Sequence, residues 1–74
     1  MLDKIREIIC HFVDIDPKEI TEETRIRSDL GLNSLELVNL AVALEEAFEL
    51  RIPDHDAAGI ETVGDIVKLI KSHQ

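Results

Sequence analysis

Hydrophobic residues recur at helical spacing over the first thirteen positions of the chain. At about 100° per residue they fall on one face, and polar side chains fall on the opposite one. The pattern predicts an amphipathic helix from Leu2 to Val13, with a buried face formed by Leu2, Ile5, Ile8, Ile9, Phe12 and Val13. Cys10 lies off this face, and with no cation beside it we expect a partly exposed, unreactive thiol.

A long connection follows this helix and runs to Leu32. Asp16 and Pro17 have the order of an N-cap and a first helical proline, which predicts a single turn over 16–19. A connection of this length is unusual in a compact domain unless it is anchored or functional. We expect three aliphatic side chains to fix it to the core: Ile20, Ile26 and Leu30.

The second helix is predicted from about Ser34 to Leu50. Its core side has ordinary helical spacing and consists of Leu37, Leu40, Ala41, Leu44 and Phe48. Pro53 is expected to end this helix, because the residue before a proline is pushed out of helical conformation. The polar stretch at 54–59 has room for only one or two helical turns.

The last helix begins after a sequence typical of a capping box, from Thr62 to Asp65. Its apolar residues share one face, which carries Val63, Ile66, Val67 and Ile70. The predicted fold class is therefore all-α: a small four-helix bundle, with three main helices, a short third helix and a long loop between the first two main helices. We expect residues 1–74 to form a single, stand-alone domain.

The outer side of the second helix is not uniformly polar. Leu35, Val38 and Val42 project together there, and three acids flank them: Glu45, Glu46 and Glu49. One interpretation packs the three apolar residues under the long loop. The other makes them a small docking patch with an anionic rim, suited to transient contact with a partner that carries Lys or Arg.

Composition narrows the classes of partner. Lys and Arg number 8 against 16 Asp and Glu, so the formal net charge is −8, and aromatic residues are only 3% of the chain. Such a chain repels nucleic-acid phosphates and anionic lipid, and it offers bases almost nothing to stack on. With no apolar run of membrane-spanning length and no signal-peptide pattern, we expect a cytoplasmic monomer without a membrane span.

The start of the second helix can be capped in two ways. Asn33 can serve as the N-cap and Glu36, three residues later, can close a capping box, which leaves the Ser34 hydroxyl spare. Alternatively, Ser34 is itself the cap. Gly31 permits a tight turn just before this point, which in the first case keeps the hydroxyl accessible.

The stretch from Asp29 to Leu37 reads DLGLNSLEL and resembles the signature of acyl carrier proteins, in which the motif ends Asp-Ser-Leu. The likeness extends over the whole chain, through the long loop, the acidic second helix and the Ile52-Pro53-Asp54 segment. It implies that Ser34 receives a 4'-phosphopantetheine arm from coenzyme A through a Mg²⁺-dependent phosphopantetheinyl transferase. The thiol of the arm would hold acyl intermediates of fatty-acid, polyketide or related biosynthesis as thioesters.

The resemblance also implies a docking surface and a class of partner. Acyl-transferring, condensing and reducing enzymes with basic surfaces would contact the second helix at Leu35, Glu36, Val38, Val42, Glu45, Glu46 and Glu49. The acyl chain would shelter in a cleft between helices. On this view the chain is a carrier and not an enzyme, has no resident metal, and uses 4'-phosphopantetheine as its covalent cofactor.

Three positions depart from the family pattern. Asn33 stands where the family usually has an Asp that helps to hold the metal of the transferase, while Asn39 and His55 stand where an acid is common. Together they hint at a dedicated set of partners rather than the general fatty-acid machinery.

Other functions have weaker support in the sequence. A hydrolase would need Ser34 activated by His11, His55 or His73, but the residues around Ser34 do not form a GxSxG elbow. Asp54, Asp56 and Asp65 have part of a calcium-loop spacing but lack its bidentate Glu. The main alternative is an unmodified interaction module of the same fold that docks basic partners through its acidic second helix.

The Asn33 departure gives a test. We predict that a phosphopantetheinyl transferase modifies Asn33→Asp faster than the parent chain, because an amide is a weaker, uncharged ligand for a hard cation. Mass spectrometry at timed intervals, under identical conditions for both chains, measures the two rates. Equal rates would show that the substitution has no effect on modification.

Overall fold

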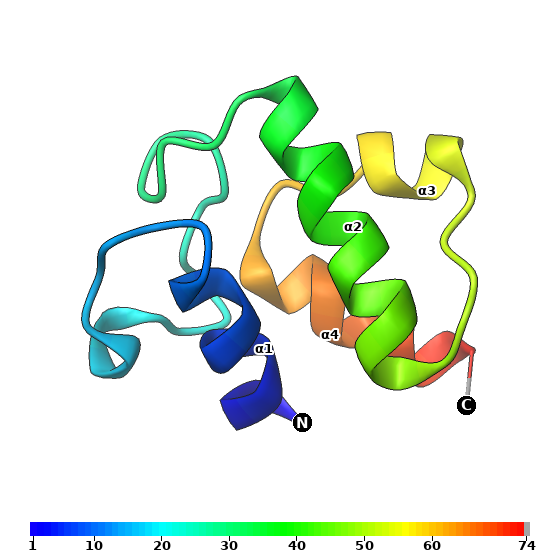
Figure 1. Cartoon of the computed structure of the whole chain (residues 1–74), viewed down its shortest axis with the longest axis horizontal. Coiled ribbons are helices and arrows are strands. Elements are labelled where there is room, and N and C mark those ends of the chain that lie inside the picture. Colours follow the sequence, from blue (N-terminus) through cyan, green and yellow to red (C-terminus); the bar gives the residue numbers. More distant parts are fainter. Residues whose placement is uncertain (74) are drawn as a thin grey trace.

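The computed structural model describes residues 1–73. Its elements are α1 (Leu2–Cys10), a 3₁₀ turn η1 (Pro17–Glu19), α2 (Ser34–Phe48), α3 (Asp54–Ala58) and α4 (Val63–Ser72). In Figure 1, α2 crosses in front of α4, with α1 and the long loop on one side and α3 on the other. The predicted all-α bundle of three main helices and one short helix is confirmed.

The core is almost entirely aliphatic. Every main helix and the long loop contribute to it, and its fully buried members are Ile5, Ile9, Ile20, Ile26, Leu40, Leu44, Val63, Ile66 and Ile70. Burying one such side chain contributes roughly 1.5–3 kcal/mol before the entropy cost of ordering it. Within residues 1–73, no buried side-chain nitrogen or oxygen atom lacks a hydrogen-bond partner. The interior is therefore held by apolar packing, as the periodicities predicted.

Both of the first two helices end earlier than predicted. In α1 the bonding changes to the tighter i→i−3 pattern at His11 and Phe12, so the helix stops at Cys10, although Phe12 and Val13 still pack against the core. In α2 the end is Phe48 rather than Leu50, because Glu49 adopts a left-handed conformation with φ 53°. The backbone turn at Glu49, not Pro53, therefore terminates α2.

The long loop is anchored by side chains and by backbone pairing. Ile20 and Ile26 are fully buried and Leu30 is nearly so, which confirms the predicted anchors. Arg25 also forms an antiparallel bridge with Thr62, the residue before α4. Three backbone hydrogen bonds fasten the loop to this segment: Ile26 N to Glu61 O at 2.9 Å, Val63 N to Thr24 O at 2.9 Å and Gly64 N to Glu22 O at 2.8 Å.

This pairing requires a glycine at the first turn of α4. A Cβ atom on Gly64 would lie 2.9 Å from the carbonyl oxygen of Glu22, which is closer than a carbon atom can approach without a shift of the loop. The glycine therefore lets the loop and α4 meet backbone to backbone.

The predicted capping box of α4 is also present. The Thr62 hydroxyl accepts a hydrogen bond from the Asp65 amide at 3.2 Å, and Asp65 accepts from the amides of Thr62 at 3.1 Å and Glu61 at 2.9 Å. The backbone hydrogen bond from Glu61, followed by that from Thr62, lowers the pKa of the Asp65 carboxyl below its ordinary value. The Asp65 carboxylate is thus ionised and serves to cap the start of α4.

Candidate functional site

A tight turn precedes α2 and fixes the direction in which the helix starts. Gly31 has φ +71°, a left-handed conformation that favours glycine, and its amide donates to the Arg27 carbonyl at 3.1 Å. Leu30 and Leu32 on either side are buried. The turn is therefore held by two core side chains, while the residues that follow it come to the surface.

Asn33 and Glu36 form the capping box of α2. The Asn33 Oδ1 atom accepts from the Glu36 amide at 2.8 Å, and Glu36 Oε1 accepts from the Asn33 amide at 3.1 Å. Asn33 has extended backbone angles, as an N-cap does, and Ser34 is the first helical residue. Asn33, and not Ser34, is therefore the cap.

The Ser34 hydroxyl is consequently free of any capping role. The residue is exposed, and its Oγ atom accepts a hydrogen bond from Arg27 Nη2 at 3.2 Å. A guanidinium is always protonated and cannot remove a proton from the serine, so this contact is not the serine–histidine arrangement of a hydrolase. The site instead presents an accessible hydroxyl beside a cation.

An apolar cavity opens next to Ser34, between α2 and α3. Its volume is about 320 Å³, and Arg27 and Ser34 line it together with Leu37, Val38, Ala41, Val42, Glu45, Ile52, Asp54, Ala57 and Ala58. A phosphate-linked arm fits this place, because the site combines a hydroxyl that caps nothing, a neighbouring cation and an open apolar hollow.

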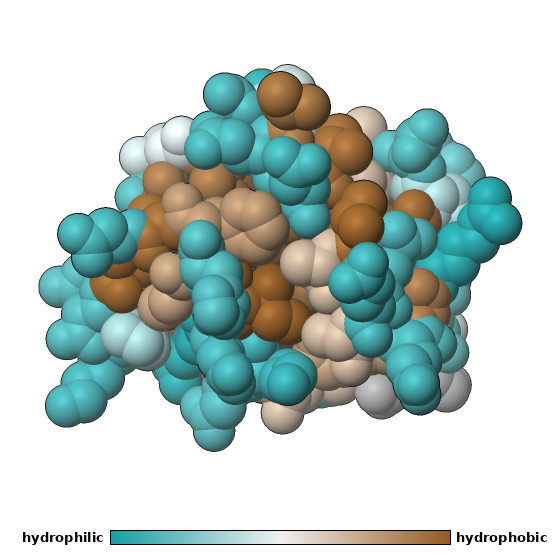
Figure 2. All heavy atoms as spheres, in the orientation of Figure 1, coloured by the Kyte–Doolittle hydropathy of each residue, from teal (hydrophilic) through white to brown (hydrophobic). Residues whose placement is uncertain are grey.

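The outer side of α2 carries an exposed apolar patch. The exposed fractions are 70% for Leu35, 51% for Val38 and 46% for Val42, so the interpretation that packs them under the long loop is wrong. The space-filling view shows hydrophobic side chains at the surface over α2, among hydrophilic neighbours (Figure 2). Exposed aliphatic groups this close together are typical of a contact surface.

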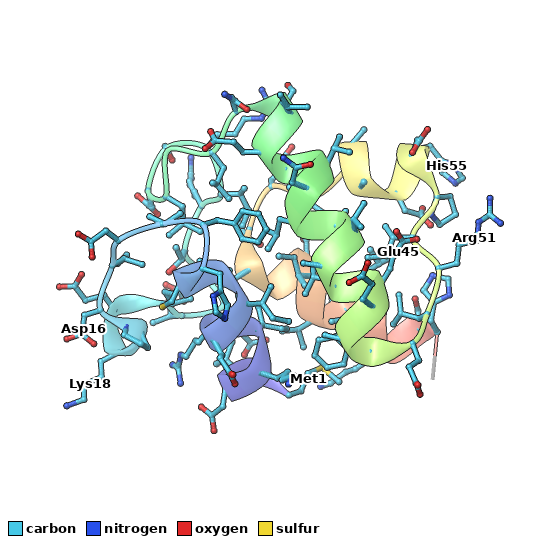
Figure 3. The ribbon with its side chains drawn as sticks, in the orientation of Figure 1. Met1, Asp16, Lys18, Glu45, Arg51 and His55 are labelled. Atoms are coloured by element: carbon cyan, nitrogen blue, oxygen red, sulfur yellow. The ribbon has the colours of Figure 1, made fainter. Side chains whose placement is uncertain are left out.

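The four acidic side chains on α2 and at its end differ in freedom. Glu46 and Glu49 are exposed, whereas Glu36 is held in the capping box. Glu45 points toward the segment between α2 and α3 (Figure 3), where its Oε2 atom accepts from the Ile52 amide at 2.7 Å. Glu45 therefore also holds the rim of the cavity.

The remaining candidates lie apart from this arrangement. Asn39 and His55 are exposed, and His55 Nε2 lies 3.4 Å from Asp56 Oδ1. The calcium-loop interpretation has no geometric support, because no group of three His, Cys, Asp or Glu side chains in the described part of the chain could hold a metal ion.

Cys10 is half-buried and its thiol is 3.5 Å from the Ile15 carbonyl oxygen. Over residues 1–73, no helix is long and apolar enough to cross a membrane.

Comparison with known proteins decides the family. A family model described as a phosphopantetheine attachment site matches residues 3–70. The acyl carrier protein of Clostridium perfringens is 48% identical over 73 residues, which are 99% of this chain and 96% of that protein. The chain belongs to the acyl carrier protein family.

Other relatives support this assignment. The acyl carrier protein of Wolinella succinogenes is 40% identical over 74 residues, covering all of this chain and 97% of that protein. The structure of the acyl carrier protein from Enterococcus faecalis has a TM-score of 0.85 at 36% identity, covering 99% of this chain and 92% of that one. A putative acyl carrier protein from Mycobacterium tuberculosis has a TM-score of 0.86 at 32% identity, covering 97% of each chain. The function is that of an acyl carrier, and the cofactor is 4'-phosphopantetheine.

Sequence reasoning missed one residue of the arrangement around Ser34. Arg27 was not singled out, although the structure places its guanidinium against Ser34 Oγ. The available signal was a basic residue seven positions before the serine in a chain with twice as many acids as bases.

The assignment of the cap generates a stability prediction. Asn33→Ala should lower the free energy of unfolding of the unmodified protein by about 1 kcal/mol, because the Glu36 amide loses its acceptor. Ser34→Ala should change it by less than about 0.5 kcal/mol, because its hydroxyl makes only a surface contact. Urea titration monitored by circular dichroism measures both. The reverse order would identify Ser34 as the cap.

Proposed function

We propose that Ser34 is the residue that carries the 4'-phosphopantetheine arm. The observation that supports this most strongly is the capping box, because it leaves the hydroxyl of an exposed serine unused at the start of α2. The matched family model spans this position and describes a phosphopantetheine attachment site. The Arg27 cation suits the anionic phosphate end of such an arm. The neighbouring apolar cavity suits the uncharged end that bears the thiol.

The loading reaction follows from the chemistry of coenzyme A. Ser34 Oγ attacks the phosphorus atom that bears the pantetheine, in the pyrophosphate of coenzyme A. The new Oγ–P bond forms as the pyrophosphate P–O bond breaks, and the adenosine bisphosphate part leaves. The hydroxyl proton passes to a base of the transferase or to solvent. Because the products are a phosphodiester and a bisphosphate, the exchange is balanced without any redox partner.

Once bound, the arm supplies a thiol on which acyl groups are held as thioesters. The chain itself presents the arm and contributes no step to the acyl chemistry, which agrees with a carrier that is not an enzyme. Its interior can receive an acyl chain at low cost, because the cavity between α2 and α3 is lined mainly by aliphatic side chains and methyl groups.

Partner enzymes are proposed to dock on the outer side of α2. The apolar centre of this surface is the exposed patch of Leu35, Val38 and Val42, and its anionic rim includes Glu46 and Glu49. Such a surface suits a partner with an apolar contact surrounded by Lys or Arg. The transferase and the acyl-transferring, condensing and reducing enzymes are the expected partners. A monomeric, single-domain, cytoplasmic carrier is part of the same proposal.

The unmodified interaction module is the alternative, and the family match does not favour it. It predicts the same docking surface but no covalent arm.

Loading separates the two functions. Incubation with coenzyme A, Mg²⁺ and a broad-specificity phosphopantetheinyl transferase should add the mass of one arm to the parent chain. Ser34→Ala should gain nothing, whereas Ser28→Ala, which alters an exposed serine in the preceding loop, should load as the parent does. An arm that persists in Ser34→Ala, or a parent that never gains one, would remove the proposal.

The docking surface has its own test. Val38→Gln introduces a better helix former but places an amide at the centre of the patch, so the KM of a condensing or acyl-transferring enzyme for the loaded protein should rise about three- to tenfold. Because Val38 also lines the cavity beside Ser34, the test is the rise in KM relative to the control variant, and kcat is not used to judge docking. Ala47→Gln is the matched control, because Ala47 is exposed on the opposite side of the same helix. Equal KM values for the two variants would contradict docking at this patch.

A further inference from the structure

The backbone of Arg27 lies in a part of the long loop that is fixed by burial and by backbone hydrogen bonds. The preceding Ile26 is fully buried, its amide donates to the Glu61 carbonyl at 2.9 Å, and its carbonyl accepts from the Leu32 amide at 3.2 Å. The Arg27 carbonyl accepts from the Gly31 amide at 3.1 Å. The backbone of Arg27 is therefore fixed relative to the start of α2, and only its side chain is free to adjust.

Within residues 1–73, no ion pair compensates the charge of Arg27. Across residues 1–73, the ion pairs are Arg6 with Asp3 and His55 with Asp56. The Arg27 side chain is exposed, and its contact is the 3.2 Å hydrogen bond to Ser34 Oγ. The guanidinium of Arg27, a cation in an acidic chain, thus donates its hydrogen bond to the hydroxyl that the proposed function modifies.

An anion placed on Ser34 meets a negative environment. The chain has a net charge of −8, and two carboxylates, Glu45 and Asp54, line the cavity beside the serine. Arg27 is the one basic residue among the described residues that line this cavity. Without it, the negative charge of a phosphodiester would face acids on the cavity side with no nearby cation to offset the repulsion.

We infer that Arg27 is the positioning residue for the phosphodiester of the arm, an inference that rests on the proposed attachment at Ser34. On loading, Ser34 Oγ becomes an ester oxygen and a poor acceptor, while the non-bridging oxygens on the attached phosphorus atom carry the charge. The guanidinium then moves its hydrogen bond from Oγ to a non-bridging oxygen. Arg–phosphate contacts are charge-assisted, short and about twice as strong as neutral ones. The first atoms of the arm are thereby held at the rim of the cavity.

Phosphorus NMR of the loaded protein tests this contact. The parent, Arg27→Gln, Arg27→Lys and Arg25→Gln are loaded to completion with excess transferase, which intact mass verifies. The ³¹P shift of each phosphodiester is compared, at low salt and in 1 M NaCl, with that of the same phosphodiester in the loaded parent unfolded in urea. Arg25 is the matched control, because it is also exposed and lies two residues away but does not line the cavity beside Ser34.

The folded parent's resonance should differ from that of the unfolded phosphodiester at low salt and move toward it in 1 M NaCl, since the Debye length falls from about 10 Å at 0.1 M to about 3 Å at 1 M. Arg27→Gln should lose most of the low-salt difference, Arg27→Lys should retain part of it, and Arg25→Gln should match the parent. Rescue by lysine is expected of an electrostatic contact and not of a merely structural one.

A second readout uses only the parent. The ¹H–¹⁵N resonance of Arg27 Nε should shift on loading, while that of Arg25 should not. Identical ³¹P shifts in the parent and Arg27→Gln, or an Arg27 Nε resonance that is unaffected by loading, would overturn this inference alone. A parent that takes up no arm would overturn the proposed function and this inference together.

Discussion

Two hydrogen bonds between Asn33 and Glu36, exchanged at the first turn of α2, determine how the site is presented. Helix starts leave backbone amides without partners, and a serine at such a start is itself a common cap. Because the side-chain oxygen of Asn33 accepts the capping hydrogen bond one residue earlier, the Ser34 hydroxyl has no structural duty and stays at the surface. The proposed attachment chemistry, the contact with Arg27 and access to the cavity all depend on that release.

The rest of the fold holds this turn in place. The left-handed Gly31 reverses the chain between two buried leucines, and the loop before it is paired with the start of α4 through backbone hydrogen bonds. One side of α2 packs in the core, while its outer side leaves aliphatic groups exposed beside carboxylates. A single helix thus serves stability on one face and, in the proposed function, recognition on the other. Glu45 joins the two roles, because its carboxylate holds the Ile52 amide at the rim of the cavity.

Features set by local spacing could be predicted from the sequence. The apolar faces, the capping box of α4 and the loop anchors follow from periodicity and from residue types a few positions apart. For the cap of α2 and for the outer patch, the sequence left two interpretations open, and the structure decides between them. The pairing of Arg25 with Thr62 could not be predicted, because it joins residues far apart in the chain that carry no matching local signal. The end of α2 was misplaced because Glu49 is in a left-handed conformation that few non-glycine residues adopt. The contact between Arg27 and Ser34 depends on the path of the turn between them, so residue types alone did not show it.

Tandem mass spectrometry of the loaded protein tests the central claim most directly, which is that the cap frees Ser34 to carry the arm. Cleavage after arginine and lysine yields a peptide of residues 28–51, whose two serines are Ser28 and Ser34. The account predicts that fragments covering 28–33 have their unmodified mass and that those extended to Ser34 carry the whole arm. An arm on the 28–33 fragments, or on any other peptide of the chain, would contradict it.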